Sequence, residues 1–90
     1  MNKRLTFMGE GFEEYLYWQT QDRKTLKRIN QLFQDIDRNG YEGIGKPEPL
    51  KHEYQGWWSR RIDDEHRLLY RIEGNEIQVI ACRFHYDASK

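Results

Sequence analysis

Residues 45–52, GKPEPLKH, place one carboxylate between two prolines and flank it with lysines. Each proline ring fixes its own φ near about −65° and biases the preceding residue toward extended backbone. Glu48 is therefore expected on a stiff, non-helical backbone, with Lys46 and Lys51 close to it in the sequence. A segment of this kind can present a catalytic carboxylate, and it can equally be the beginning of a strand.

Other residues supply what RNA cleavage without a metal requires. Such a reaction needs a base for the ribose 2′-OH, an acid for the leaving 5′-oxygen, and cations for the charge on the phosphorane. Glu48 or a lysine is a candidate base. His85 is a candidate acid, because an imidazole has an ordinary pKa of about 6.5 and so both of its forms are available near neutrality. Arg61 and Arg67 carry planar donor groups that suit phosphate oxygens.

Each candidate also has a simpler interpretation. Tyr86 and Trp57 have rings on which bases can stack, as in single-stranded RNA recognition, but at least one of the two adjacent tryptophans is expected in the core. Glu48 can be a solvated acid, and His85 can be a surface histidine. The arginines can pair with the acidic turn at residues 63–65, a surface contact that contributes about 1 kcal/mol or less.

Two helices are predicted after a short strand at residues 3–8. The first begins near Glu10, and four of its residues fall at helical spacing: Phe12, Tyr15, Leu16 and Gln19. Asp22 is a suitable N-cap for the second helix, which Asn39 and Gly40 should end. Its apolar stripe comprises Leu26, Ile29, Leu32, Phe33 and Ile36.

After residue 40 the period changes from helical to the alternation of strands. GWWSRRI and HRLLYRI predict two strands joined by the acidic turn, and Gly74-Asn75 predicts a hairpin before a last strand, IQVIACRFHY. This order favours an α+β fold in which two N-terminal helices cover one face of a twisted, largely antiparallel sheet. The other face should then be free for function.

Strand alternation sorts the side chains between these two faces. The helix-covered face is expected to hold Leu68, Tyr70, Ile72, Trp58 and Ile62. The opposite face is expected to hold Arg67, Arg71, Trp57, Ser59 and Arg61. We therefore expect Arg61 and Arg67 to converge on the uncovered side of the sheet.

Composition narrows the class of protein. The 90 residues predict a single domain, residues 1–86, followed by a short tail at 87–90, and the net charge of +0 provides no overall positive field for nucleic acid. The single cysteine fits a reducing compartment. No apolar run resembles a membrane span or a signal peptide, so we expect a cytoplasmic protein. As a separate expectation, the protein needs no cofactor.

A metal site is not expected. Cys82 and His85 are three residues apart in a predicted strand, which should point them to opposite faces. His52 and His66 have no cysteine at zinc-ligand spacing.

Five segments resemble the YoeB toxins, which belong to the RelE superfamily of bacterial type II toxin–antitoxin systems. These segments are YLYWQ at 15–19, KRIN at 27–30, EGIGKPEPLKH at 42–52, WSRRIDDEHRLLY at 58–70 and ACRFHY at 81–86. The likeness runs from the first strand to Tyr86. The chain departs from the family pattern in continuing with residues 87–90.

The resemblance implies an mRNA endonuclease that works in the decoding site of the ribosome without a metal, a cognate YefM-like antitoxin, and frequent homodimers. It implies general base, general acid and transition-state roles for Glu48, His85 and Arg67, respectively. Supporting roles around the scissile phosphate fall to Lys51, Arg61 and Tyr86, and Lys46 is expected to help hold the RNA. The alternative is a non-catalytic module of the same fold that binds only an antitoxin or ribosomal RNA.

Overall fold

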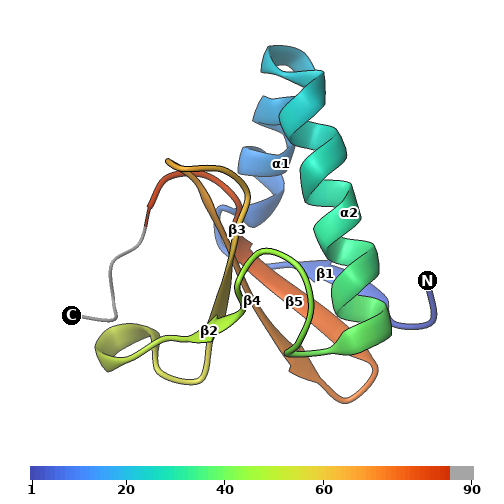
Figure 1. Ribbon diagram of the computed structural model, residues 1–90, viewed down its shortest axis with the longest axis vertical. Coiled ribbons are helices and arrows are strands. Elements are labelled where there is room, and N and C mark those ends of the chain that lie inside the picture. Colours follow the sequence, from blue (N-terminus) through green and yellow to red (C-terminus); the bar gives the residue numbers. More distant parts are fainter. Residues whose placement is uncertain (86–90) are drawn as a thin grey trace.

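The computed structural model describes residues 1–85, so the predictions for Tyr86 and for the tail at 87–90 lie outside the described residues. Figure 1 shows two helices standing beside a twisted sheet. The elements are β1 (Arg4–Phe7), α1 (Gly11–Gln21), α2 (Arg23–Asn39), β2 (Glu48–Pro49), the 3₁₀ turn η1 (His52–Tyr54), β3 (Trp58–Arg61), β4 (Arg67–Glu73) and β5 (Glu76–Ala81).

The strands form one sheet in the order β1-β5-β4-β3-β2. β1 pairs with β5 in parallel, whereas the pairs β2–β3, β3–β4 and β4–β5 are antiparallel. The predicted α+β class and largely antiparallel sheet are confirmed. The predicted hairpin is also present, and Gly74 adopts a φ of 56° between β4 and β5.

The helix boundaries follow the capping residues that the sequence predicts. The Asp22 side chain accepts hydrogen bonds from the backbone N–H groups of Lys24 and Thr25, and so caps α2. Gly40, at a φ of 69°, donates to the carbonyl of Ile36 and ends α2. Within the described part of the chain, neither helix has the length and apolar character needed to cross a membrane.

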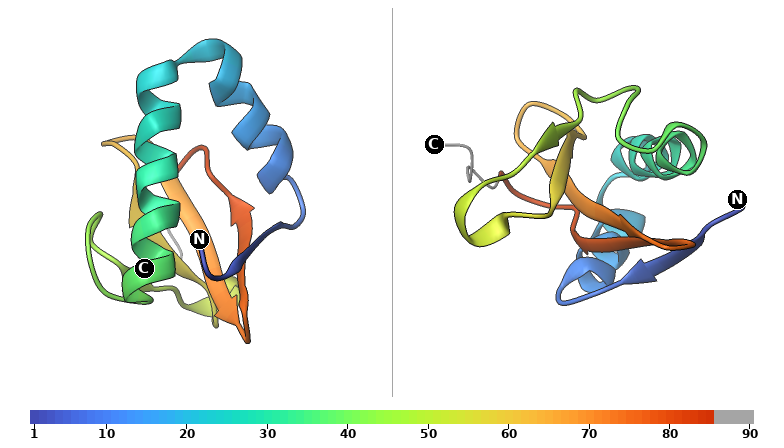
Figure 2. Two further views of the ribbon diagram at one scale, coloured as in Figure 1. Left: turned by 90° about the vertical axis from the view of Figure 1, so that its right-hand side faces the viewer. Right: turned by 90° about the horizontal axis from the view of Figure 1, so that it is seen from below.

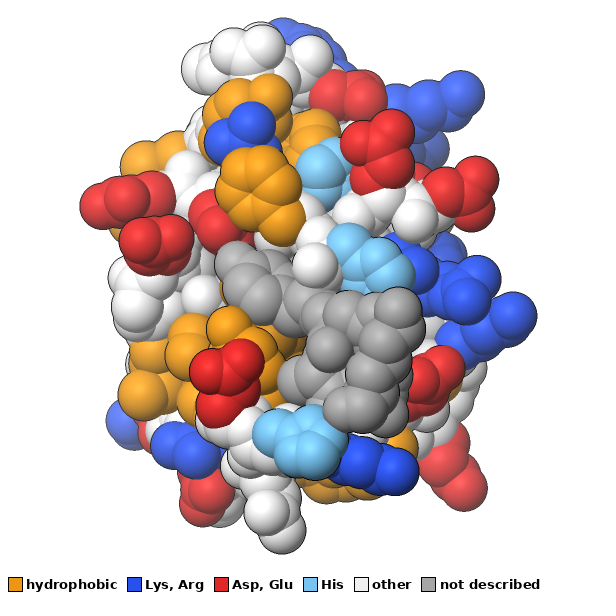
Figure 3. Space-filling model, turned by 90° about the vertical axis from the view of Figure 1, so that its left-hand side faces the viewer, with side chains coloured by type: hydrophobic (Ala, Val, Ile, Leu, Met, Phe, Trp, Pro, Cys, Tyr) orange, Lys and Arg blue, Asp and Glu red, His pale blue; other side chains and the backbone are white. Residues whose placement is uncertain are grey.

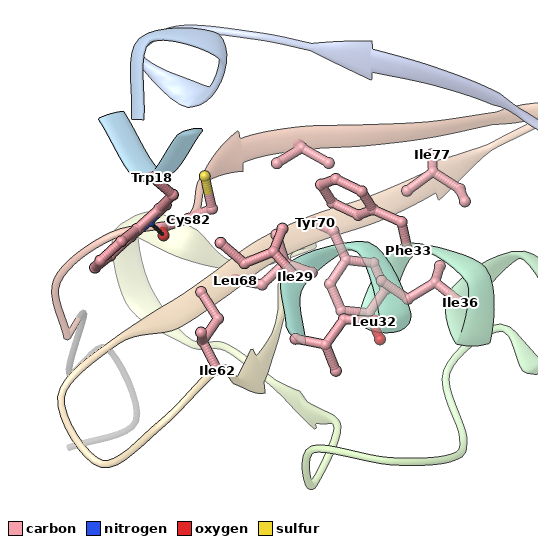
Figure 4. Close-up of a cluster of buried hydrophobic side chains, with 11 residues drawn as sticks. Trp18, Ile29, Leu32, Phe33, Ile36, Ile62, Leu68, Tyr70, Ile77 and Cys82 are labelled. Carbon is pink, nitrogen blue, oxygen red and sulfur yellow. Dashed lines mark hydrogen bonds between the residues drawn. The ribbon is translucent and has the colours of Figure 1, made fainter. Parts of the chain in front are cut away.

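The main core lies between α2 and the sheet. Figure 4 shows the α2 stripe facing strand residues, with Trp18 and Cys82 at one end of the cluster. Ile29, Leu32 and Ile36 have no exposed surface, as expected for the centre of the stripe. Leu68 and Tyr70 of β4 are equally buried, which confirms the predicted helix-covered face.

α1 buries a different set of residues from those that suggested the helix. Phe12 and Leu16 are exposed, whereas Gly11, Glu14 and Trp18 are buried. A Cβ on Gly11 would lie only 2.5 Å from the carbonyl oxygen of Val79, so glycine permits the helix to start against β5. The buried face of α1 is therefore directed at the end of β5 and the residues after it.

Arg60 has no exposed surface and lies on the helix side of β3. Its guanidinium donates to Asp35, to the hydroxyl of Tyr70 at 3.1 Å, and to the carbonyl oxygens of Gly40, Glu42 and Ile44. Burial acts to raise the pKa of Asp35, but hydrogen bonds from Arg60, the Ile44 N–H and Asn39 outweigh it and keep that pKa below its ordinary value. Arg60 thus joins α2 to the loop that precedes β2.

The opposite face of the sheet is not entirely free, which corrects the expectation from sequence. Leu50, Leu69 and Ala81 form a second buried cluster there. The half-buried rings of Tyr54 and Trp57 pack against it. The segment from β2 to β3 therefore covers part of this face. Figure 2 shows that segment projecting on the side of the sheet away from α2.

Candidate active site

The segment that carries Glu48 runs along the edge of the sheet beside β3. The Arg61 N–H donates to the Gly45 carbonyl at 2.7 Å, and the Leu50 N–H donates to the Trp57 carbonyl at 2.9 Å. Between these contacts Glu48 pairs with Ser59. Prolines lack an N–H donor and are tolerated at a sheet edge, so the Pro-Glu-Pro sequence suits this position.

Glu48 is exposed, but its backbone is held on both sides. Gly45 has a φ of 81°, and a Cβ there would lie 3.0 Å from the Leu32 side chain and 3.1 Å from the Arg61 carbonyl. On the other side, Leu50 is buried in the second cluster. The carboxylate is therefore presented to solvent from a backbone with little freedom.

Strand pairing puts Glu48 on the same face as two arginines. Glu48 pairs with Ser59, Arg61 lies two residues further along β3, and Arg61 pairs with Arg67 of β4. Paired residues, and residues two apart in a strand, share a face. From ordinary strand spacings, the Cα atoms of Glu48 and Arg67 are about 12 Å apart. The predicted placement of Arg61 and Arg67 on one face of the sheet is confirmed.

The two arginines differ in how firmly they are held. Arg67 is buried, and its Nη1 donates to the carbonyl oxygens of Asp63 at 2.7 Å and His66 at 3.0 Å. The Asp63 carboxylate instead accepts the N–H groups of Glu65 and His66, so it shapes the turn. Arg61 is exposed. Arg67 is thus a fixed cation, and Arg61 a cation at the surface.

The chain leaves the sheet earlier than predicted. β5 ends at Ala81, whereas the sequence suggested a strand through Tyr86. The Cys82 N–H donates to the Glu14 carboxylate at 2.8 Å, and the Cys82 carbonyl accepts the Trp18 indole N–H at 2.8 Å. Side chains of α1 thus replace strand partners. The premise that Cys82 and His85 lie in one strand was therefore wrong, although Cys82 is buried and His85 is exposed.

The next residues return to the start of β4. The Phe84 N–H donates to His66 Nδ1 at 2.7 Å, and the Phe84 carbonyl accepts the Arg67 N–H at 2.9 Å. His85 follows directly and is exposed. The backbone therefore brings His85 close to Arg67, the residue that pairs with Arg61. The Arg83 guanidinium lies 3.6 Å from the centre of the Tyr17 ring and adds a second contact to α1.

Two buried groups, the Glu14 carboxyl and the Cys82 thiol, lie behind this segment, and burial disfavours their ionised forms. Burial, the largest effect, raises the pKa of the Glu14 carboxyl against the Cys82 N–H hydrogen bond. Burial also raises the pKa of the Cys82 thiol to about 12, assisted by nearby Glu14. The thiolate that would bind a metal or attack a substrate is therefore scarce near neutrality. Among residues 1–85 no three His, Cys, Asp or Glu side chains are grouped to hold a metal ion.

Three other predicted residues lie further from Arg67. Lys46 is exposed at a φ of 50°, next to the Gly45–Arg61 contact. Trp57 lies about 13 Å along β3 from Arg61, by strand spacing. The Arg71 guanidinium is 4.4 Å from the centre of a Trp57 ring. Lys51 is exposed at this same end, just before η1.

Figure 3 shows the face of the molecule on which these elements meet. Histidine side chains are visible on this face, and lysine and arginine side chains, interspersed with acidic ones, lie along its right-hand edge. The sequence did not indicate that Glu14, Trp18 and His66 hold the segment after β5. The motifs YLYWQ and DEHRLLY contain two of them, but their contacts lie at least 18 residues away in the chain.

A family model described as "YoeB-like toxin of bacterial type II toxin-antitoxin system" matches residues 7–86. The chain belongs to this family. The resemblance read from the five sequence segments is thereby confirmed.

The sequences of two YoeB toxins are similar to this chain along nearly its whole length. Toxin YoeB of Streptomyces coelicolor is 49% identical over 83 residues, which are 92% of this chain and 99% of that protein. Toxin YoeB of Escherichia coli K12 is 48% identical over the same proportions of both chains.

Solved structures of YoeB toxins share the fold. The YoeB dimer from Staphylococcus aureus has a TM-score of 0.89 at 48% identity, covering 96% of this chain and 100% of that one. A heterotetrameric YoeB–YefM toxin–antitoxin complex from the same organism has a TM-score of 0.87 at 48% identity, with the same coverage. E. coli YafQ, at 13% identity and a TM-score of 0.76, shares the fold alone. The predicted RelE-like architecture is confirmed.

Proposed function

We propose that this YoeB-like toxin is an endoribonuclease that cleaves mRNA in the ribosomal A site and so blocks translation. The observation that carries the proposal is the attachment of the His85-bearing segment to β4 at Arg67, on the face that also presents Glu48 and Arg61. This arrangement supports a site that combines a candidate base, a candidate acid and two cations. These are the groups that cleavage at a ribose 2′-OH requires.

Each residue has a role in this proposal. Glu48 takes the proton from the 2′-OH, which attacks the adjacent phosphorus. Arg67 stabilises the charge on the phosphorane, and Arg61 binds a phosphate oxygen at the surface. His85 gives a proton to the leaving 5′-oxygen. The products are a 2′,3′-cyclic phosphate and a 5′-hydroxyl, and no step requires a metal or a cofactor.

The remaining predicted residues bind and position the RNA. Lys46 and Lys51 lie on either side of Glu48 and attract the flanking phosphates. Trp57, the residue just before β3, is assigned to an adjacent base. Tyr86 lies outside the described residues, and its proposed supporting role beside the scissile phosphate comes from the family resemblance.

The partners follow from the relatives. We infer a cognate YefM-like antitoxin, because a YoeB–YefM complex is among the similar structures. A homodimer is inferred from the similar YoeB dimer. The ribosome places the proposed site of action in the cytoplasm. With a net charge of +0, the protein has little general attraction for free RNA, so the ribosome is proposed to present the message.

Translation-coupled mRNA cleavage tests the proposal, with wild-type protein and His85→Ala, each with and without ribosomes. We expect wild type to cut only when ribosomes are present. We expect His85→Ala to cut about 10²- to 10⁴-fold more slowly, the usual contribution of a positioned acid. Folded wild-type protein that leaves ribosome-bound mRNA intact would contradict the proposal and favour the non-catalytic binding module.

A further inference from the structure

Phe84, the residue before His85, has an unusual backbone conformation. Its φ is 67°, in the left-handed region that bulky residues rarely occupy. Such a conformation persists only where the surroundings hold it. Its side chain is exposed, so burial of the ring does not explain the conformation. The hydrogen bonds of its backbone therefore become important.

Both backbone polar groups of Phe84 are held by adjacent residues at the start of β4. The carbonyl accepts the Arg67 N–H at 2.9 Å, and the N–H donates to His66 Nδ1 at 2.7 Å. The second bond uses a side chain where a sheet would use a carbonyl. It requires a His66 ring that is unprotonated at Nδ1.

The His66 ring is itself held in place. It meets the Trp18 ring edge-on, with centroids 4.8 Å apart, and only 15% of its side chain is exposed. The Trp18 indole donates to the carbonyl of Cys82, two residues before Phe84. Trp18 and His66 therefore contact both sides of the bend that leads to His85.

We propose that His66 is a positioning residue for cleavage, because its Nδ1 holds the Phe84 amide and thereby places His85 beside Arg67. The inference rests on the proposed function, in which His85 is the acid. Loss of the bond would allow Phe84 to relax toward extended backbone and would displace His85. A displacement of about 1 Å at a reacting group can cost about 100-fold in rate.

Two substitutions separate hydrogen bonding from packing. His66→Asn keeps an acceptor bonded to Cγ, where Nδ1 stands, but loses most of the contact with Trp18. His66→Leu keeps an apolar contact with Trp18 and loses the acceptor. In single-turnover cleavage of ribosome-bound mRNA, we expect His66→Leu to be about 100-fold slower than wild type. We expect His66→Asn to retain most of the rate, although Asn fills less of the space against Trp18.

Amide hydrogen exchange at Phe84, measured by NMR on the free proteins, provides a second readout. Protection in wild type and His66→Asn, with its loss in His66→Leu, supports the inference. An active His66→Leu beside an impaired His66→Asn would overturn it, because His66 would then act through packing. Wild type that cuts no RNA would overturn the proposed function instead. Exchange would still decide the anchoring, since equal protection in all three proteins would exclude it.

Discussion

Glu48→Gln is expected to lower the rate of ribosome-dependent mRNA cleavage by about 10²- to 10⁴-fold. Glutamine has the shape of glutamate but cannot accept the proton of the 2′-OH. The Glu48 side chain is exposed, and the flanking Gly45–Arg61 and Leu50–Trp57 contacts are made by the backbone. The variant should therefore keep its melting temperature and its affinity for the antitoxin.

Glu53→Gln is the matched control for this substitution. Glu53 is an exposed acid in η1, in the same segment between β2 and β3. The Glu53→Gln substitution removes the same charge as Glu48→Gln. We expect the Glu53→Gln protein to cleave mRNA at the wild-type rate. Equal loss of cleavage in both variants would point to a general effect of charge, and undiminished cleavage by Glu48→Gln would remove Glu48 from the mechanism.

Arg60→Ala is expected to destabilise the fold by about 3–5 kcal/mol, the usual effect of breaking a buried ion pair. The guanidinium is fully buried, and it satisfies Asp35, the Tyr70 hydroxyl and three carbonyl oxygens in the 40–44 loop. Alanine would remove the guanidinium donor from all of these acceptors, and Asp35 would keep only its bonds from Asn39 and the Ile44 N–H. For a domain of this size, the melting temperature should fall by more than about 12 °C, as thermal unfolding will show.

Arg61→Ala, at the next position of β3, is the control for stability. Its side chain is exposed, and we expect a change within about 0.5 kcal/mol. The two variants should therefore have different defects. Arg60→Ala is expected to lose stability, whereas Arg61→Ala is expected to stay folded and to lose RNA cleavage. A loss below about 1 kcal/mol in Arg60→Ala would show that the buried network contributes little.

The sheet and the placement of its arginines could be predicted because strand alternation is a local rule. WSRRI and HRLLYRI alternate clearly, so the shared face of Arg61 and Arg67 follows from the order of the residues alone. The same rule puts Arg60 on the helix side, against the usual exposure of arginine. What makes that burial possible is a set of acceptors spread from Asp35 to Tyr70, which local spacing does not reveal.

The second apolar cluster could not be predicted in the same way. Leu50, Tyr54 and Trp57 come from a segment with one two-residue strand and a 3₁₀ turn, so their spacing has no regular period. The packing of this segment against Leu69 is decided by tertiary contacts. The sequence indicated that Glu48 stands on a rigid backbone, but not that Leu50 is one of its anchors.

The path of the chain after β5 also could not be predicted from local sequence patterns. Apolar residues through Ile80 and the aromatic residues beyond suggested one long strand. Instead, the backbone of Cys82 is hydrogen-bonded to the side chains of Glu14 and Trp18, and the chain turns at Phe84. α1 was identified from Phe12, Tyr15, Leu16 and Gln19. Of these, Tyr15 packs against the core, whereas Phe12 and Leu16 are exposed. The residues that hold Cys82 were not among them.

Activation of the ribose 2′-OH as the nucleophile on this face can be tested with a chemically altered message. The experiment uses ribosome complexes that carry mRNA with a single 2′-deoxynucleotide on the 5′ side of the scissile phosphate. We expect cleavage at that phosphate to be lost. A 2′-deoxynucleotide one position further upstream should leave the rate of cleavage there unchanged. Cleavage at an unchanged rate across the 2′-deoxynucleotide would contradict a mechanism in which Glu48 activates the 2′-OH.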